Sequence, residues 1–78
     1  MESTIAIAFG TVLRRLRTTA GMTQEQLGLA AGLQRKYISL LELGTKAPSL
    51  ATVLRIATAL DVDPGELVSL VSTQVLEG

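Results

Sequence analysis

Apolar side chains recur every three to four residues along most of the chain, which is the spacing of an α-helix that buries one face. No stretch alternates apolar and polar residues over the length of a strand between turn signals, so no sheet is expected. The pattern predicts an all-α fold in a single domain over residues 1–78, because no linker is long enough to separate two domains. The five expected helices lie at about residues 4–20, 24–31, 34–43, 50–60 and 64–75.

Residues that cap or break helices stand at the boundaries of these segments. Ser3 or Thr4 can cap the first helix, and Thr23 followed by Gln26 has the spacing of a capping box. Gly32 allows a sharp turn after the second helix, because glycine tolerates a positive φ. The other boundary residues are Gly21, Gly44, Ser49, Asp63 and Pro64.

The apolar spacing also predicts which side chains face the core. In the third helix, Ile38 and Leu41 are expected to point inward, whereas Arg35, Lys36 and Ser39 point elsewhere. The expected inward set of the fourth helix is Leu50, Val53, Leu54, Ala57 and Leu60.

Charge is unevenly distributed, although the formal net charge is +0. All basic residues except Arg55 lie between positions 14 and 46, where the only acids are Glu25 and Glu42. From Asp61 onward the chain carries acids and no base. This asymmetry favours two faces, one of them basic enough to meet a polyanion.

Composition narrows the classes of function. The chain has no cysteine and no histidine, so it lacks thiolate chemistry and the commonest general base and metal ligand. No carboxylates are paired at a catalytic spacing, and we expect no enzyme, no metal and no cofactor. No apolar run reaches the length of a membrane span, which favours a cytoplasmic protein. An apolar fraction of 47% in so short a chain suggests self-association.

Residues 24–43, QEQLGLAAGLQRKYISLLEL, have the composition of two short helices that cross at a steep angle. Such helices need a small residue where they touch and a glycine in the turn, and Gly28 and Gly32 meet these needs. This leaves the first turn and the outer face of the third helix free to meet DNA. The expected shared interior is Leu27, Ala31, Leu33, Ile38 and Leu41.

The segment GMTQEQLGLAAGLQRKYISLLELG resembles the XRE or lambda-repressor-like helix-turn-helix family. In length and in the RKYIS stretch the chain is most similar to the controller proteins of restriction-modification systems. The resemblance covers about Phe9 to Leu67. It implies a five-helix domain, a homodimer, and binding to a palindromic double-stranded DNA operator near promoters, where RNA polymerase is a possible further partner.

The resemblance assigns roles to residues at matching positions. Gln24 is expected to reach a phosphate, and Arg35 is the candidate for bonding guanine O6 and N7. Arg17 and Glu42 match a salt bridge that ties the first helix to the end of the third. The other expected DNA-binding residues are Gln34 and Lys36 at the base-facing start of the third helix, Tyr37 and Ser39 at the backbone or groove edge, and Lys46 along the phosphate strand.

Some positions leave alternatives open. Leu40 and Leu43 are apolar where family members often carry polar contact residues, although Leu40 can meet a thymine methyl group. Arg14 and Arg15 either contact phosphate or only solvate the outer face of the first helix. Tyr37 is also well suited to a half-buried structural position.

The last helix, at about residues 64–76, is apolar around much of its circumference. It is either an ordinary core helix or a dimerisation helix in which Leu70, Gln74 and Val75 form a two-fold interface. The apolar run at residues 5–8 either caps the core or extends this dimer contact. The competing function is an antitoxin or anti-regulator that acts mainly by binding another protein.

Overall fold

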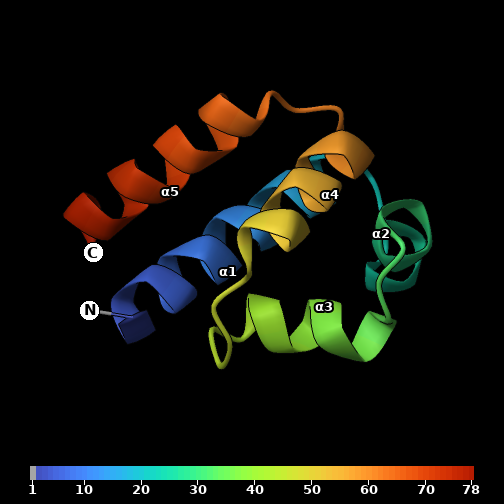
Figure 1. The fold of residues 1–78 in the computed structure, drawn as a ribbon, viewed down its shortest axis with the longest axis horizontal. Helices are drawn as coiled ribbons and strands as arrows, with labels where there is room; N and C mark the ends of the chain where they lie inside the picture. The colour runs from blue at the N-terminus through green and yellow to red at the C-terminus, as the bar shows by residue number, and fades with distance from the viewer. Residues whose placement is uncertain (1) are drawn as a thin grey trace.

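The computed structural model describes the backbone of residues 2–78 and the side chains of residues 4–78. It confirms an all-α fold of five helices, with no strand among the described residues. In chain order the helices are α1 (Glu2–Thr19), α2 (Gln24–Ala31), α3 (Arg35–Glu42), α4 (Leu50–Leu60) and α5 (Pro64–Glu77) (Figure 1).

The expected bounds of α2 and α4 are confirmed, and the other helices differ by a few residues. α1 begins at Glu2, so Thr4 lies inside the helix and is not its cap; the side chain of Ser3 lies outside the described residues. The helix extends this far because Ala6 and Ala8 pack into the structure, each only 4% exposed. Gln34 precedes α3 as its N-cap instead of opening the helix.

Local sequence explains the helix starts. The Thr23 side chain accepts a hydrogen bond from the Gln26 backbone N–H, and the Gln26 side chain accepts one from the Thr23 backbone N–H, which completes the capping box. Asp63 caps α5 by accepting from the Glu66 backbone N–H at 3.1 Å. Gly32 has a φ of 72°, a left-handed conformation that costs glycine little.

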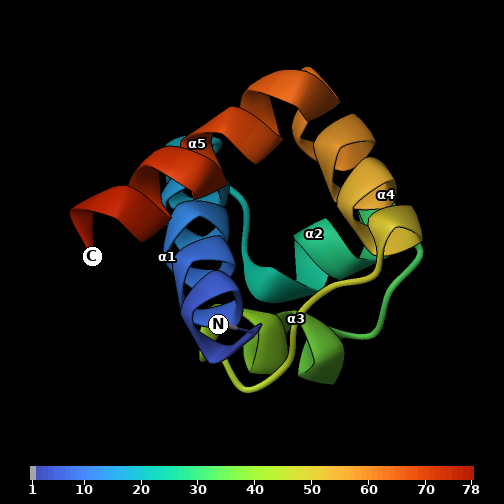
Figure 2. The ribbon, with the colours of Figure 1, turned by 60° about the vertical axis from the view of Figure 1, so that its left-hand side comes forward.

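α1 packs against α3 and against α5, which lies alongside it (Figure 1). α2 and α3 pack together, and α3 also packs against α1 and lies below it in the turned view (Figure 2). The N-terminal end of α1 and the end of α5 meet where Thr4 and Gly78 line the same hollow. The helix-turn-helix and the chain termini therefore lie at different parts of α1.

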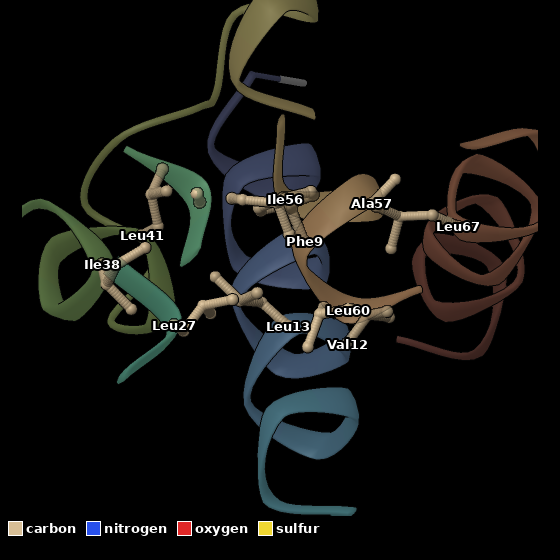
Figure 3. Close-up of a cluster of buried hydrophobic side chains, with 11 residues drawn as sticks. Phe9, Val12, Leu13, Leu27, Ile38, Leu41, Ile56, Ala57, Leu60 and Leu67 are labelled. Atoms are coloured by element: carbon tan, nitrogen blue, oxygen red, sulfur yellow. The ribbon is translucent and has the colours of Figure 1, made fainter. Parts of the chain in front are cut away.

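Side chains from all five helices form one core (Figure 3). Burying an aliphatic side chain of leucine size contributes about 1.5–3 kcal/mol, so this cluster is the main source of stability. Its members are Phe9, Val12, Leu13, Leu27, Ala31, Ile38, Leu41, Ile56, Ala57, Leu60 and Leu67.

The expected inward face of α4 was partly wrong. Leu50 is 70% exposed and Leu54 is also exposed, whereas Ile56 is fully buried. Apolar residues surround this helix almost completely, so their spacing fits more than one rotation about the axis. Contacts with α2 and α5 decide the rotation, and short-range periodicity does not contain them.

Candidate DNA-binding site

The turn between α2 and α3 depends on the absence of a side chain at Gly28. A Cβ atom at this position would come within 2.5 Å of the carbonyl oxygen of Leu33, so any larger residue would push the two helices apart. The Leu33 backbone N–H in turn donates to the Gly28 carbonyl at 2.8 Å. Gly28 thus fixes the start of α3 against α2.

α3 has one buried face and one exposed face. Ile38 and Leu41 point into the core, as expected, and are fully buried. Gln34, Arg35 and Lys36 are exposed at the start of the helix. The helix therefore presents polar and cationic side chains to solvent at the end where the sequence predicts base contacts.

A salt bridge joins α1 to the end of α3. Arg17 Nε donates to Glu42 Oε2 at 2.5 Å, and Arg17 Nη2 donates to Glu42 Oε1 at 3.0 Å. Arg17 Nη1 also donates to the carbonyl of Met22, at the start of the turn into α2. The Glu42 side chain is only 1% exposed, so this pair holds three segments of chain together in a largely dry environment.

Gln24, at the first position of α2, connects this salt bridge to Arg35. Its Nε2 donates to Glu42 Oε1 at 3.0 Å, which leaves its Oε1 to accept from Arg35 Nη1 at 3.5 Å. The structure thus brings Gln24, Arg35, Arg17 and Glu42 together. We call these four residues, with Arg14, the Glu42 network.

The charge of Glu42 follows from its contacts. Burial raises the pKa of the carboxyl, but hydrogen bonds from Arg17 and Gln24 and the nearby positive charges outweigh burial and hold the pKa below its ordinary value. The hydrogen bond to Glu42 raises the pKa of Arg17. Both groups are therefore charged at neutral pH, and the network has a fixed charge pattern.

Arg14 belongs to this network, although the sequence alone left its role open. Its Nε lies 3.5 Å from Glu42 Oε1, and its side chain is 64% exposed. The spacing of Arg14 and Arg17, three residues apart on one helix, was the available signal, because such residues share a face.

The remaining expected DNA-binding residues lie on α3 or after it. Tyr37 is half-buried and packs against the core, and Ser39 and Leu40 are also half-buried. Lys46 is exposed in the loop between α3 and α4, apart from the Glu42 network. Leu43 is exposed at the C-cap of α3.

The residues expected at a dimer interface lie on α5, away from α3 (Figure 1). Leu70 packs against the core and is half-buried. Gln74 and Val75 line a hollow beside the N-terminal part of α1. Other exposed apolar side chains are Ile5 and Ile7 of α1, for which the sequence left open a role in the core or in the dimer contact, and Val68 and Leu76 of α5, which the sequence-based interface did not include.

The described residues contain neither a membrane-spanning helix nor a metal-binding cluster. None of their helices is both long and apolar enough to cross a membrane. Within the same part of the chain, no three acidic residues gather as a possible metal site.

Comparison with known proteins identifies the arrangement. A helix-turn-helix family model matches residues 13–67. The chain is 38% identical over 68 residues to the control protein C.BamHI of Bacillus amyloliquefaciens, covering 86% of this chain and 84% of the relative.

Solved structures agree with this match. The restriction-modification controller protein C.AhdI of Aeromonas hydrophila is 45% identical, with a TM-score of 0.77 over 80% of this chain and 94% of that one. The controller protein C.Esp1396I, solved as a tetramer with its natural 35 base-pair operator, is 25% identical, with a TM-score of 0.83 over 92% of this chain and 95% of that one. These findings confirm the family resemblance drawn from the sequence. The chain belongs to the helix-turn-helix family of XRE-type, DNA-binding transcriptional regulators.

Proposed function

We propose that this protein is a homodimeric operator-binding regulator and the controller of a restriction-modification system. The observation that carries the proposal is the exposed start of α3, where Arg35 and Lys36 project beside the N-terminus of α2. The similarity to C.BamHI and C.AhdI supports the role of controller. The C.Esp1396I complex supports binding to operator DNA.

In this proposal α3 enters the major groove of the operator. Arg35 bonds guanine O6 and N7 through two guanidinium N–H groups, and Gln34 and Lys36 contact neighbouring groups in the groove. Gln24 donates the second N–H of its Nε2 to a DNA phosphate at the N-terminus of α2, where backbone N–H groups favour anions, while its Oε1 keeps the contact with Arg35. Tyr37, Ser39 and Lys46 contact the DNA backbone and so set the register.

The same proposal uses α5 to form the dimer. On this helix Val68 is 53% exposed and Leu76 is 86% exposed, and Leu70, Gln74 and Val75 are half-buried. A patch of this kind on so small a domain is best explained by a partner that covers it. A two-fold dimer would set two α3 helices about 34 Å apart, one turn of duplex, so the operator would be a near-palindrome.

The mechanism of regulation follows from where the dimer binds. A dimer upstream of a promoter can recruit RNA polymerase, and a dimer across the promoter excludes it. The cellular setting of this proposal is the cytoplasm, where the operator and polymerase are found.

The test begins with selection of bound sequences from a random duplex pool, followed by binding measurements at matched salt. Arg35→Ala should weaken binding to the selected operator tenfold or more, because each bidentate guanine contact is worth about 1–3 kcal/mol. Arg55→Ala, the same change at an exposed arginine on α4, is the control and should leave affinity nearly unchanged. Equal affinity of wild type and Arg35→Ala would contradict the role of Arg35.

The salt dependence of wild-type binding gives an independent check. About six phosphate contacts per dimer should lower the affinity about a thousandfold between 50 and 200 mM salt. A chain that selects no DNA sequence and binds no duplex would instead support the protein-binding alternative.

A further inference from the structure

Arg14 occupies an unusual position for a surface arginine. It lies one turn before Arg17 on α1, and Glu42 holds its Nε at 3.5 Å. The Glu42 oxygen that faces Arg14 is the same Oε1 that accepts from Gln24 Nε2. Arg14 is therefore fixed beside the start of α2, at the edge of the surface that presents Arg35.

The charges of the Glu42 network do not balance. Its one carboxylate takes two short hydrogen bonds from Arg17, which leaves little of its charge to compensate Arg14. Arg35 touches the network only through the neutral amide of Gln24. Three arginines face one carboxylate in the Glu42 network, so the surface around Gln24 keeps an excess of positive charge even with the exposed Glu25 beside it, which favours binding of an anion.

We propose that Arg14 is a phosphate-binding residue that extends the DNA-binding surface from α2 and α3 onto α1. The proposal rests on the DNA-binding function proposed above. A phosphate is the fitting group because α1 packs behind α3, with Gly10 against the Leu41 and Glu42 carbonyls, so Arg14 lies beside α3 and not at its base-facing start. Groups that flank a recognition helix meet the DNA backbone.

The neighbouring Arg15 provides a matched control. It has the same side chain, lies on the same helix and is also exposed, but it points about 100° further around the helix axis. It makes no ion pair with another described residue. A general effect of positive charge would make the two arginines equivalent, whereas a specific phosphate contact separates them.

The experiment compares Arg14→Ala, Arg14→Lys and Arg15→Ala in binding to a labelled duplex of random sequence at several salt concentrations. Loss of one phosphate contact in each subunit of the dimer should reduce the slope of log affinity against log salt by about 1.8 and weaken binding about thirtyfold at 0.15 M salt. We expect this from Arg14→Ala, recovery of most of the slope in Arg14→Lys, and a change of less than about twofold from Arg15→Ala. Equal effects of Arg14→Ala and Arg15→Ala would overturn the proposal.

Urea unfolding of each variant separates binding from folding. If Arg14→Ala lowers the free energy of unfolding but leaves the salt slope unchanged, Arg14 only supports Glu42 and the proposal is wrong. If the wild-type chain binds no duplex, the proposed function fails together with this inference. If the wild type binds and Arg14→Ala binds equally well at every salt concentration, only the inference about Arg14 fails.

Discussion

The two halves of α1 have different kinds of neighbours: charged side chains surround its C-terminal half, and apolar side chains surround its N-terminal half. Toward its C-terminal end, Arg17 is hydrogen-bonded to Glu42, and Arg14 forms a longer ion pair with the same carboxylate. Toward its N-terminal end, Ile5 and Ile7 lie among apolar side chains that remain partly exposed. The polar half is held in place within one chain, whereas the apolar half still has surface to bury. One helix thus separates the surface proposed to meet DNA from the surface proposed to meet a second copy.

The largest expected effect comes from removing Glu42, which holds the polar half of α1 against α3. Glu42→Ala leaves Arg17, which is mostly buried, and Gln24 without their acceptor, and loss of one partner of a buried pair costs about 3–5 kcal/mol. Urea unfolding should show this loss of stability. Glu25→Ala, at an exposed acid in the first turn of α2, is the control and should change stability by less than about 1 kcal/mol, the value of such a charge at a helix N-terminus. Similar small effects from both variants would mean that the network does not hold the helices together.

A smaller effect is expected from placing a charge in the apolar surface that α5 forms beside the N-terminal half of α1. Val68→Asp places a charge in the exposed apolar surface of α5 and should weaken self-association at least tenfold, about 1.4 kcal/mol, because the carboxylate must lose water in an interface. Sedimentation at several concentrations measures this change. Thr58→Asp adds the same charge at an exposed position of α4 on the side of α2, and should leave the dimer intact. Dimers of unchanged affinity in Val68→Asp would place the interface elsewhere.

The smallest expected effect is a change in how stability depends on pH, and it tests the C-terminal, polar half of α1 alone. The pKa of Glu42 is lower in the folded chain than its ordinary value of about 4.3, so its contribution to stability is complete above that value. It is lost as the pH falls through the folded pKa. Stability measured from pH 6 to pH 2 should therefore fall less steeply in Glu42→Gln than in wild type or in Glu25→Gln. Parallel curves for all three would show that Glu42 does not contribute to acid unfolding.

Much of the fold follows from local sequence, because caps and turns depend on neighbouring residues. Thr23 with Gln26, and Asp63 with Pro64, specify where α2 and α5 begin. The rotation of α4 was predicted less well, since Ile56 is selected by contacts with distant helices.

The candidate site also has a part that the sequence predicted and a part that it did not. The exposed start of α3 was predictable from helical spacing and from the glycine at position 28. The contacts of Gln24 with Glu42, 18 residues away, and of Arg14 with the same carboxylate were not, because they depend on how side chains meet between packed helices. Periodicity gives the face on which a residue lies and not its partner across an interface.

The contact at Gly10 has a mechanical consequence. A Cβ atom there would collide with the main-chain carbonyls of Leu41 and Glu42. The backbones of α1 and of the end of α3 are therefore in direct contact, with no side chain between them. This direct contact leaves little room for α3 to slide along α1. In a dimer that forms through α5, the rigid α1 would fix the distance between the two-fold axis and each α3 helix. A change in the spacing between operator half-sites would then weaken binding, because the two α3 helices could not shift to follow it.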